Sequence, residues 1–365
     1  MEYKMIPVGD LELGKIVAED IFANTRYPII SKNTPITYEH LHVFKVFNIH
    51  EVPILVETIK KTVPNNEGDV EEIEVTEQVI HINTFEKQYL DTVEKFKKEF
   101  SNWEAGAKID MTKVREATFP LIENILEDRS YLFDLNSYSN PKDYLYHHCI
   151  ATGLISAAIA NKLGFDRGNT IQMAIAGTLA DCGMSKISKS IRNKKEALTE
   201  MEFNEIRKHP IYSYNMVKDL PALKADMKIA ILQHHERLDG SGYPLGKQLK
   251  SVSQAAQIIA VADTFHAMTS ERLYRAKESP FKVIEMIKES EFGKFDIKVV
   301  NAITNLVADL PIGTKVELSN LERAEVMFVN QFSPTRPIVR LLKSGEIIDL
   351  SKNRTYTISR VITNE

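Results

Sequence analysis

The sequence predicts a mainly α protein, with a central all-α bundle between a small α+β module and a small β-rich module. Apolar residues recur at helical spacing through the middle of the chain, and proline, serine, threonine and aspartate there are typical of helix starts. Near both ends, short apolar runs alternate with glycine and proline turns, which indicates strands.

The composition is that of an ordinary globular protein. The chain has 365 residues, 43% of them hydrophobic, which suits about two domains and an appendage. The net charge of −4 and the lack of a strongly basic stretch argue against nucleic acid polymers as partners. There is no apolar signal segment and no apolar run of about eighteen residues, and the two cysteines form no C-x-x-C. We therefore expect a cytoplasmic protein without a membrane span.

Residues 1–56 form the predicted α+β module. Strands are expected at 27–30 and 52–56, and a helix at 37–47. The histidines of this module have no ligand-like spacing, so we interpret them as ordinary surface or core imidazoles: His40, His42 and His50.

A connecting segment is expected over residues 57–136. Residues 57–75 are polar and acidic and predict a solvated connection. Residues 76–135 show helical periodicity, which indicates packing helices or the dimerisation helices of a homodimer.

The bundle is expected over residues 137–310, where the pattern changes at Asn140. Pro141 favours the first turn of a helix, and Thr199 with Glu202 forms a capping box. Helices are predicted from Pro141, over 171–181, 199–209, 225–232 and 253–268, and from Pro280 and Asp296. Residues 311–365 return to strand patterns, with strands expected at 323–330 and 338–342 and a hairpin turn at 344–346.

The stretch QHHERLDGSGYP, residues 233–244, suggests a chemical role. His234 and His235 stand near the expected end of a helix, where the following glycines release the chain into a loop. Such an imidazole pair suits a divalent metal, although two histidines alone could equally cap the helix end.

Further metal-binding residue types lie on the other helices of the bundle. Asp263 stands in the apolar helix IIAVADTFHAM, where a buried carboxylate needs a partner. A bundle can bring such positions together at its centre, where imidazoles and carboxylates would hold two cations that clamp a phosphodiester. The candidate ligands are His148, Asp181, His209, His234, His235 and Asp263.

The order of motifs resembles the HD-GYP phosphodiesterases, which hydrolyse the bacterial second messenger cyclic di-GMP. The resemblance covers residues 137–310 and rests on YLYHHC (144–149), KHP (208–210), HHERLDGSGYP (234–244), VADTFHAMTSERLYR (261–275) and EFGKFD (291–296). It implies an all-α metal-binding domain in cyclic di-GMP signalling, with one or two divalent cations per chain, iron or manganese.

The resemblance also implies roles for individual residues. His148 and Asp263 match ligands of a first metal, Asp181 the bridging aspartate, and His209, His234 and His235 the ligands of a second metal. Asp181, Arg272 and Arg275 are the expected catalytic residues, the two arginines facing the substrate phosphates. The ligand or partner loop comprises Asp239, Gly240, Gly242, Tyr243 and Pro244.

The sequence departs from the family pattern at the motif H-D-x-G-K. Ala180 replaces its histidine and Met184 its lysine. Three further positions differ from the pattern, namely Tyr144, His266 and Leu273. Losing a direct ligand should cost at least about 10- to 100-fold in metal affinity, and losing one cationic donor about 10²–10³ in rate. His147, Cys182 and His266 are the neighbours considered as replacement ligands, and the first two are expected to point away.

Three functions remain open from the sequence. The first is a cyclic di-GMP phosphodiesterase with an impaired first metal site. The second is an inactive relative that binds cyclic di-GMP or docks a diguanylate cyclase or other signalling protein through the Gly-Tyr-Pro loop. The third is a structural bundle in which the histidines only pack, which is disfavoured because clustered imidazoles are costly to bury without a metal.

Overall fold

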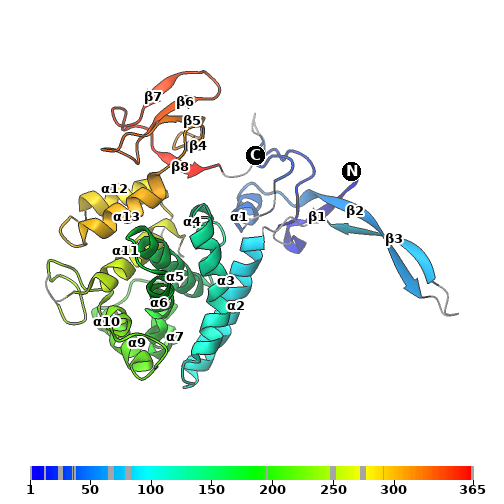
Figure 1. The fold of residues 1–365 in the computed structure, drawn as a ribbon. Coiled ribbons are helices and arrows are strands. Elements are labelled where there is room, and N and C mark those ends of the chain that lie inside the picture. Colours follow the sequence, from blue (N-terminus) through cyan, green and yellow to red (C-terminus); the bar gives the residue numbers. More distant parts are fainter. Residues whose placement is uncertain are drawn as a thin grey trace. The chain divides into compact units, whose positions relative to one another are not determined.

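The computed structural model describes residues 2–11, 14–23, 28–34, 36, 38–64, 70–78, 84–194, 196–246, 252–271, 277–290 and 292–362. The chain forms two compact units, Met1–Lys87 and Gln88–Glu365. The predicted class is confirmed, since the chain is a mainly helical bundle with a small sheet before it and another after it (Figure 1).

The first unit has the α+β character predicted for residues 1–56, and it extends to Lys87. Its antiparallel sheet has the order β1-β2-β3, from β1 (Glu2–Pro7), β2 (Glu51–Pro64) and β3 (Val70–Gln78). The 3₁₀ helix η1 (Val8–Asp10) follows β1, and the expected helix is α1 (Tyr38–Val46). Phe44 of α1 is fully buried in one hydrophobic cluster with Val52 and Ile54 of β2.

Two local predictions in this unit are wrong. Residues 57–75 were expected to be a solvated connection, but most of them belong to β2 and β3, which pair from Val56–Gln78 to Pro64–Val70. The β-branched residues of this segment favour strands. Pairing of the two strands also satisfies the backbone hydrogen-bonding groups, despite the acidic composition. The strand expected at 27–30 is reduced to an isolated bridge between Ile21 and Ile30, and Tyr27 lies outside the described residues.

Two long helices precede the bundle. They are α2 (Thr84–Glu104) and α3 (Met111–Glu127), followed by the short α4 (Tyr131–Asp134). Phe96 and Trp103 of α2 pack edge to face with ring centroids 5.4 Å apart, and α3 packs against the first two helices of the bundle. The packing role predicted for this region is thus confirmed, and dimerisation stays a prediction.

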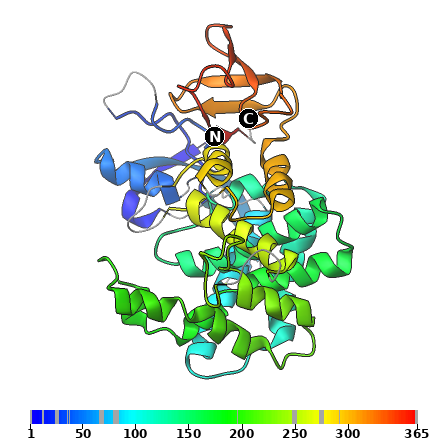
Figure 2. The same cartoon turned by 90° about the vertical axis from the view of Figure 1, so that its left-hand side faces the viewer.

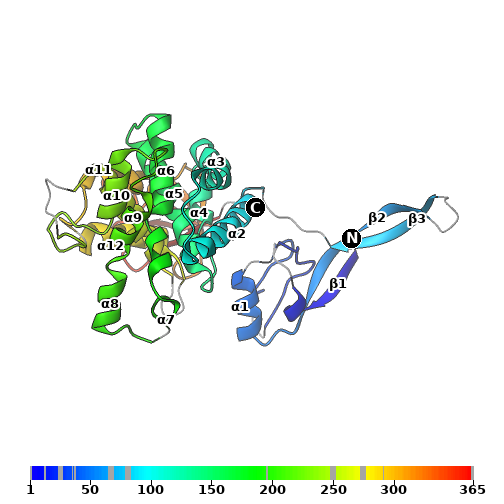
Figure 3. The same ribbon diagram turned by 90° about the horizontal axis from the view of Figure 1, so that it is seen from below.

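The bundle is helical throughout, and its central helices are buried on most sides. Its members are α5 (Tyr144–Lys162), α6 (Arg167–Leu179), η2 (Cys182–Lys186), α7 (Lys189–Arg192), α8 (Glu200–Ile206), α9 (His209–Val217), α10 (Ala225–Gln233), α11 (Gln254–Thr269), α12 (Pro280–Ser290) and α13 (Ile297–Ala308). Figure 3 shows α5 and α6 side by side. They can approach closely because residue 153 is glycine. A Cβ at this position would lie only 2.1 Å from Thr178 Oγ1.

Several helix boundaries differ from the prediction. The helix expected over 171–181 is α6, which runs from Arg167 to Leu179. α5 begins at Tyr144 rather than Pro141, because the Asn140 side chain accepts a hydrogen bond from the Asp143 N–H and holds a turn. The helix expected over 199–209 ends at Ile206, and His209 instead opens α9, where Pro210 is tolerated in the first turn. The capping box of Thr199 and Glu202 is confirmed.

The C-terminal module is an antiparallel sheet with the order β7-β6-β5-β4-β8. Its strands are β4 (Lys315–Leu318), β5 (Arg323–Phe328), β6 (Ile338–Leu341), β7 (Ile347–Asp349) and β8 (Ile358–Val361). The predicted strands and the hairpin turn at Gly345 (φ 74°) are confirmed. Arg336 pairs with Glu285 of α12 through two contacts of 2.7 Å, and Figure 2 shows the sheet next to α12 and α13. Of the helices that the structure describes, none is long and apolar enough to span a membrane.

Candidate metal centre

Two buried helices supply the first histidine–aspartate pair. α5 packs against α11, and His148 on α5 lies opposite Asp263 on α11, with Nε2 2.8 Å from Oδ1. The carboxyl group of Asp263 stands in an apolar helix and is 9% exposed, so it requires a compensating partner. His148 is that partner.

Asp181 connects this pair to three further imidazoles. It follows α6 at the start of η2, where the Gly183 N–H donates to Ser213 Oγ of α9 at 2.8 Å. A Cβ on Gly183 would lie 2.3 Å from the carbonyl oxygen of His209, so only glycine lets η2 approach α9 this closely. That approach places Asp181 Oδ1 3.0 Å from His209 Nε2, while Oδ2 lies 3.6 Å from His148 Nε2.

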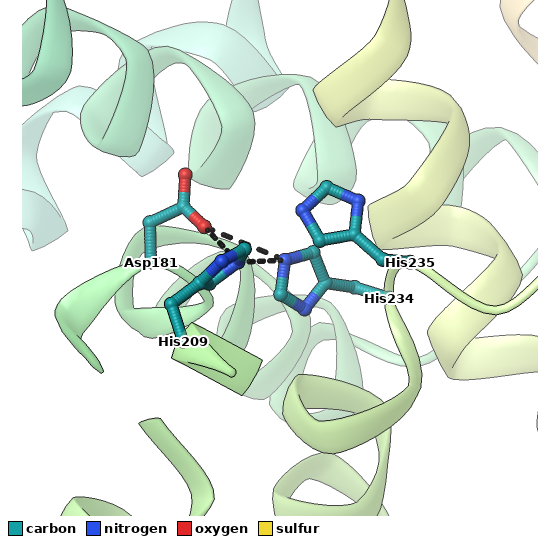
Figure 4. A group of neighbouring side chains, drawn as sticks. All are labelled: Asp181, His209, His234 and His235. Carbon is teal, nitrogen blue, oxygen red and sulfur yellow. Dashed lines mark hydrogen bonds and ion pairs between the residues drawn. The ribbon is translucent and has the colours of Figure 1, made fainter. Parts of the chain in front are cut away.

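The remaining two histidines stand where α10 ends. His234 caps α10 and places its Nε2 3.4 Å from Asp181 Oδ1, and His235 Nδ1 lies 3.7 Å from Asp263 Oδ2. Figure 4 shows that the side chains of Asp181, His209 and His234 point toward one another, with His235 beside them. The candidate ligand atoms fall into two sets, in each of which they lie within 4.8 Å of one another. We call them the His148 group (His148, Asp181, Asp263) and the His209 group (Asp181, His209, His234, His235).

Backbone carbonyls orient two rings of the His209 group. His209 Nδ1 lies 2.8 Å from the oxygen of Ile206, and His234 Nδ1 lies 2.7 Å from that of Ile231. Because a carbonyl only accepts, we assign the proton of each ring to Nδ1, so each Nε2 presents a lone pair. The two Nε2 atoms are 3.3 Å apart, and both face the buried Asp181 Oδ1, which has no hydrogen-bond donor. Acceptors that converge in this way repel one another unless a cation lies between them, so the group fits a divalent metal.

The electrostatics of the site keep its carboxyl groups ionised. Burial alone would raise the pKa of Asp181, but when no cation is bound, protonation of His209 and His234 outweighs burial and holds the pKa of Asp181 well below its ordinary value. Burial would also raise the pKa of Asp263, but His148 and His235 lower it on balance. Burial and the neighbouring His234 lower the pKa of His235 well below its usual range. Anionic carboxylates and a neutral imidazole are the forms that bind a metal.

Comparison with known proteins identifies the domain. The HD domain family model matches residues 120–299. Over 220 residues the chain is 30% identical to "Cyclic di-GMP phosphodiesterase PdeB" of Borreliella burgdorferi, covering 59% of this chain and 57% of that protein. Over 261 residues it is 28% identical to "Cyclic di-GMP phosphodiesterase PA4108" of Pseudomonas aeruginosa, covering 69% and 63%.

Residues 120–299 are an HD domain, related to those of HD-GYP cyclic di-GMP phosphodiesterases.

The chain spans about three fifths of the length of these two relatives. A solved structure, Bd1817, an HDG"Y"P protein from Bdellovibrio bacteriovorus, has the same fold with a TM-score of 0.51. It is 15% identical, and the match covers 83% of this chain and 98% of that one.

The HD domain orients His148 from its other edge. His148 Nδ1 lies 2.9 Å from His266 Nδ1 and 3.2 Å from the Tyr144 hydroxyl, and His266 Nε2 lies 3.1 Å from Ser270 Oγ. Tyr144 and His266 therefore hold the ring of His148 from the side opposite Asp263.

None of the three neighbours considered as replacement ligands belongs to either group, in the part of the chain that the structure describes. His147 Nε2 lies 3.3 Å from Asn140 Nδ2, and Cys182 directs its sulfur toward the Ser213 carbonyl, so both side chains have partners elsewhere. Ala180, 2% exposed where α6 ends, offers no ligand atom. The structure thus brings all six predicted ligands together, whereas Arg272 and Arg275 lie outside the described residues.

The Gly-Tyr-Pro loop folds back onto the metal centre. The Tyr243 N–H donates to the His235 carbonyl at 3.1 Å, and its ring stacks on the His235 ring with centroids 4.7 Å apart. The Asp239 carboxylate accepts hydrogen bonds from Ser241, and Gly240 turns the chain with a φ of 83°. The loop therefore lies against a member of the His209 group.

Two residues at this site escaped the sequence analysis. Glu236 is fully buried and accepts a hydrogen bond from the Leu245 N–H at 2.7 Å, which closes the loop after Pro244. Arg207 packs on the ring of Tyr243. Each of them has a signal in the sequence. Glu236 is a charged residue directly after the two histidines, and Arg207 is a cation two residues before His209.

Replacing Gly242 with alanine is expected to destabilise the protein by about 1–3 kcal/mol, the usual cost of overpacking. The new Cβ would lie 2.4 Å from both the His235 carbonyl oxygen and the Arg237 nitrogen, which are backbone atoms with little room to move. Thermal unfolding and manganese titration would measure the effect on stability and on the His209 group. Gly9→Ala is the control, since a Cβ there meets nothing within 4 Å. Equal behaviour of the two variants would contradict the close packing.

Acid is expected to destabilise the metal-free protein partly through His147. Burial lowers the pKa of His147 from 6.5 to about 4, so the unfolded chain takes up this proton first as the pH falls. Between pH 6.5 and 4 the free energy of unfolding should drop by up to about 3 kcal/mol on this account. Denaturant unfolding of wild type and His147→Gln after chelation would show a shallower decline in the variant. Parallel declines would contradict the assignment.

Proposed function

We propose that this HD domain hydrolyses cyclic di-GMP with the help of divalent cations, and that its turnover is weak. The observation that carries the proposal is the arrangement of Asp181, whose two carboxylate oxygens face two different sets of imidazoles. Two sites that share one carboxylate form an arrangement suited to a phosphodiester. The similarity to two cyclic di-GMP phosphodiesterases supports cyclic di-GMP as the substrate.

When bound, divalent cations polarise the phosphodiester and lower the pKa of water. The chain's own residues would hold them: His148, Asp181 and Asp263 in one group, and Asp181, His209, His234 and His235 in the other. The carbonyls of Ile206 and Ile231 fix the ring orientations, and their removal would typically cost 10- to 100-fold in affinity. Burial of both groups excludes bulk water and strengthens the electrostatic interactions with an anionic substrate.

Weak turnover is proposed because of Ala180 and Met184. The His148 group contains three residues, of which two are carboxylates and one is an imidazole, whereas the His209 group contains three imidazoles and a carboxylate. A histidine in place of Ala180, the direct neighbour of Asp181, is the ligand that the family pattern would add. The half-buried Met184 stands in η2, where the same pattern has a lysine.

The test is metal analysis combined with a hydrolysis assay. We expect the purified chain to retain manganese or iron, and to release linear dinucleotide or GMP from cyclic di-GMP slowly, above a metal-free control. Absence of product with every metal tested would refute the enzymatic proposal.

The second candidate is a relative that binds cyclic di-GMP, or a partner such as a diguanylate cyclase, without hydrolysis. Two observations favour it. Ala180 and Met184 remove groups needed for hydrolysis, whereas in the loop Gly242 still packs closely against the backbone and Tyr243 still stacks on His235. Calorimetry with the metal-loaded protein and cyclic di-GMP separates the two candidates, since binding without product supports the second. If the protein neither binds cyclic di-GMP nor releases product, docking of a partner protein is the remaining role. Co-purification with a diguanylate cyclase would test it.

A further inference from the structure

Arg207 occupies a position at the edge of the metal centre. It follows α8 and stands two residues before His209, and its guanidinium carbon lies 5.2 Å from the centroid of the Phe203 ring. It also lies 5.1 Å from the centroid of the Tyr243 ring. Tyr243 in turn stacks on His235, so one aromatic ring contacts both the guanidinium and a member of the His209 group.

The charge of Arg207 is not compensated in the part of the chain that the structure describes. No carboxylate there forms an ion pair with it, and its Nε is buried without a hydrogen-bond partner. The neighbouring cations differ in this respect, since Lys208 pairs with Glu205 at 2.7 Å and Lys194 with Glu202 at 2.6 Å. A half-buried guanidinium that no carboxylate neutralises is a suitable partner for an anionic ligand.

The stacking also prepares Arg207 for such an anion. Two aromatic rings restrict the guanidinium, so less rotational freedom is lost when its planar fork meets a phosphate. Arg237 lies in the same loop region, but its guanidinium is already engaged. Its Nη1 donates to the Glu236 carbonyl at 3.0 Å, and its guanidinium packs on Phe295. Of these two arginines in the described residues, Arg207 therefore combines aromatic contacts with a guanidinium that no carboxylate pairs with.

We propose that Arg207 binds the phosphodiester of a cyclic dinucleotide that is not being cleaved. The inference rests on the proposed function, in which the other phosphodiester lies at the two metal-binding groups. A cyclic dinucleotide holds its two phosphates apart on one ring, and Arg207 lies beside the His209 group, in contact with the same Tyr243 ring as His235. Such a cation would favour ligands with two phosphates over ligands with one.

The test is calorimetry on manganese-loaded protein with cyclic di-GMP and with GMP. Arg207→Gln is expected to weaken cyclic di-GMP binding about 10- to 100-fold, the usual effect of losing a charge-assisted hydrogen bond. GMP affinity should stay within about twofold, because its single phosphate occupies the metal-binding groups. Lys208→Gln is the matched control, since it removes a charge from the adjacent residue, and it should bind both ligands like wild type.

Arg207→Lys keeps the positive charge, so it serves as a second variant in case Arg207→Gln fails to fold. It should bind cyclic di-GMP more tightly than Arg207→Gln and less tightly than wild type, because it lacks the stacked fork. Wild-type affinity in Arg207→Gln, or an equal loss for GMP, would overturn the assignment while leaving the proposed function intact. Failure of the wild type itself to bind cyclic di-GMP would refute the proposed function and this inference together.

Discussion

Asp181→Asn is expected to lower the affinity for divalent metal at least about 100-fold and to abolish hydrolysis of cyclic di-GMP. The amide keeps the shape of the side chain but loses the negative charge that both groups share. The imidazoles of His148, His209 and His234 would then lack their common anionic neighbour.

Elemental analysis after gel filtration and a manganese titration would measure this loss. Asp219→Asn is the control, because Asp219 is an exposed carboxylate just beyond α9 and belongs to neither group. A variant at Asp181 that retains as much metal as wild type would show that the Asp181 carboxylate is not a metal ligand.

The double substitution Ala180→His and Met184→Lys is expected to raise the metal content from about one per chain to about two, given the cost of a missing ligand. It should also raise the rate of cyclic di-GMP hydrolysis about 10²–10³-fold, the typical contribution of one electrostatic donor. Ala180 ends α6 directly before Asp181, and Met184 lies three residues later in η2, so both new side chains would start close to the His148 group.

The single variants separate the two effects. Ala180→His should change mainly the metal content, and Met184→Lys mainly the rate, although effects on one reaction need not multiply. Ala180→Gln is the matched control, since it adds bulk at a buried position without an imidazole. Full metal content and rapid turnover in the wild type would show that the two replacements cause no impairment.

The sequence predicted the convergence of the six candidate ligands because their local patterns are strong. Asp263 stands in an apolar helix, and His209 and His234 stand at helix ends, where short-range signals such as Pro210 and the following glycines fix the chain. In a helical bundle, polar side chains that point into the core from several helices are buried against one another at its centre.

What the sequence analysis missed depends on packing between distant segments. The stacking of Arg207 on Tyr243 joins residues 36 positions apart, and no local period signals it. The hairpin of β2 and β3 was mistaken for a solvated connection because its acidic composition hid the strand-forming residues. The helix α5 starts at Tyr144 rather than at Pro141 because the Asp143 N–H donates a hydrogen bond to the Asn140 side chain, which holds a turn there.

The position of Asp181 between both groups has a thermodynamic consequence. A cation in either group would draw on the same carboxylate and fix its rotamer, so occupancy of one group changes the free energy of loading the other. By reciprocity, each cation must alter the affinity for its neighbour by the same factor. A metal titration of this protein should therefore follow a cooperative or anticooperative isotherm rather than the sum of two independent ones.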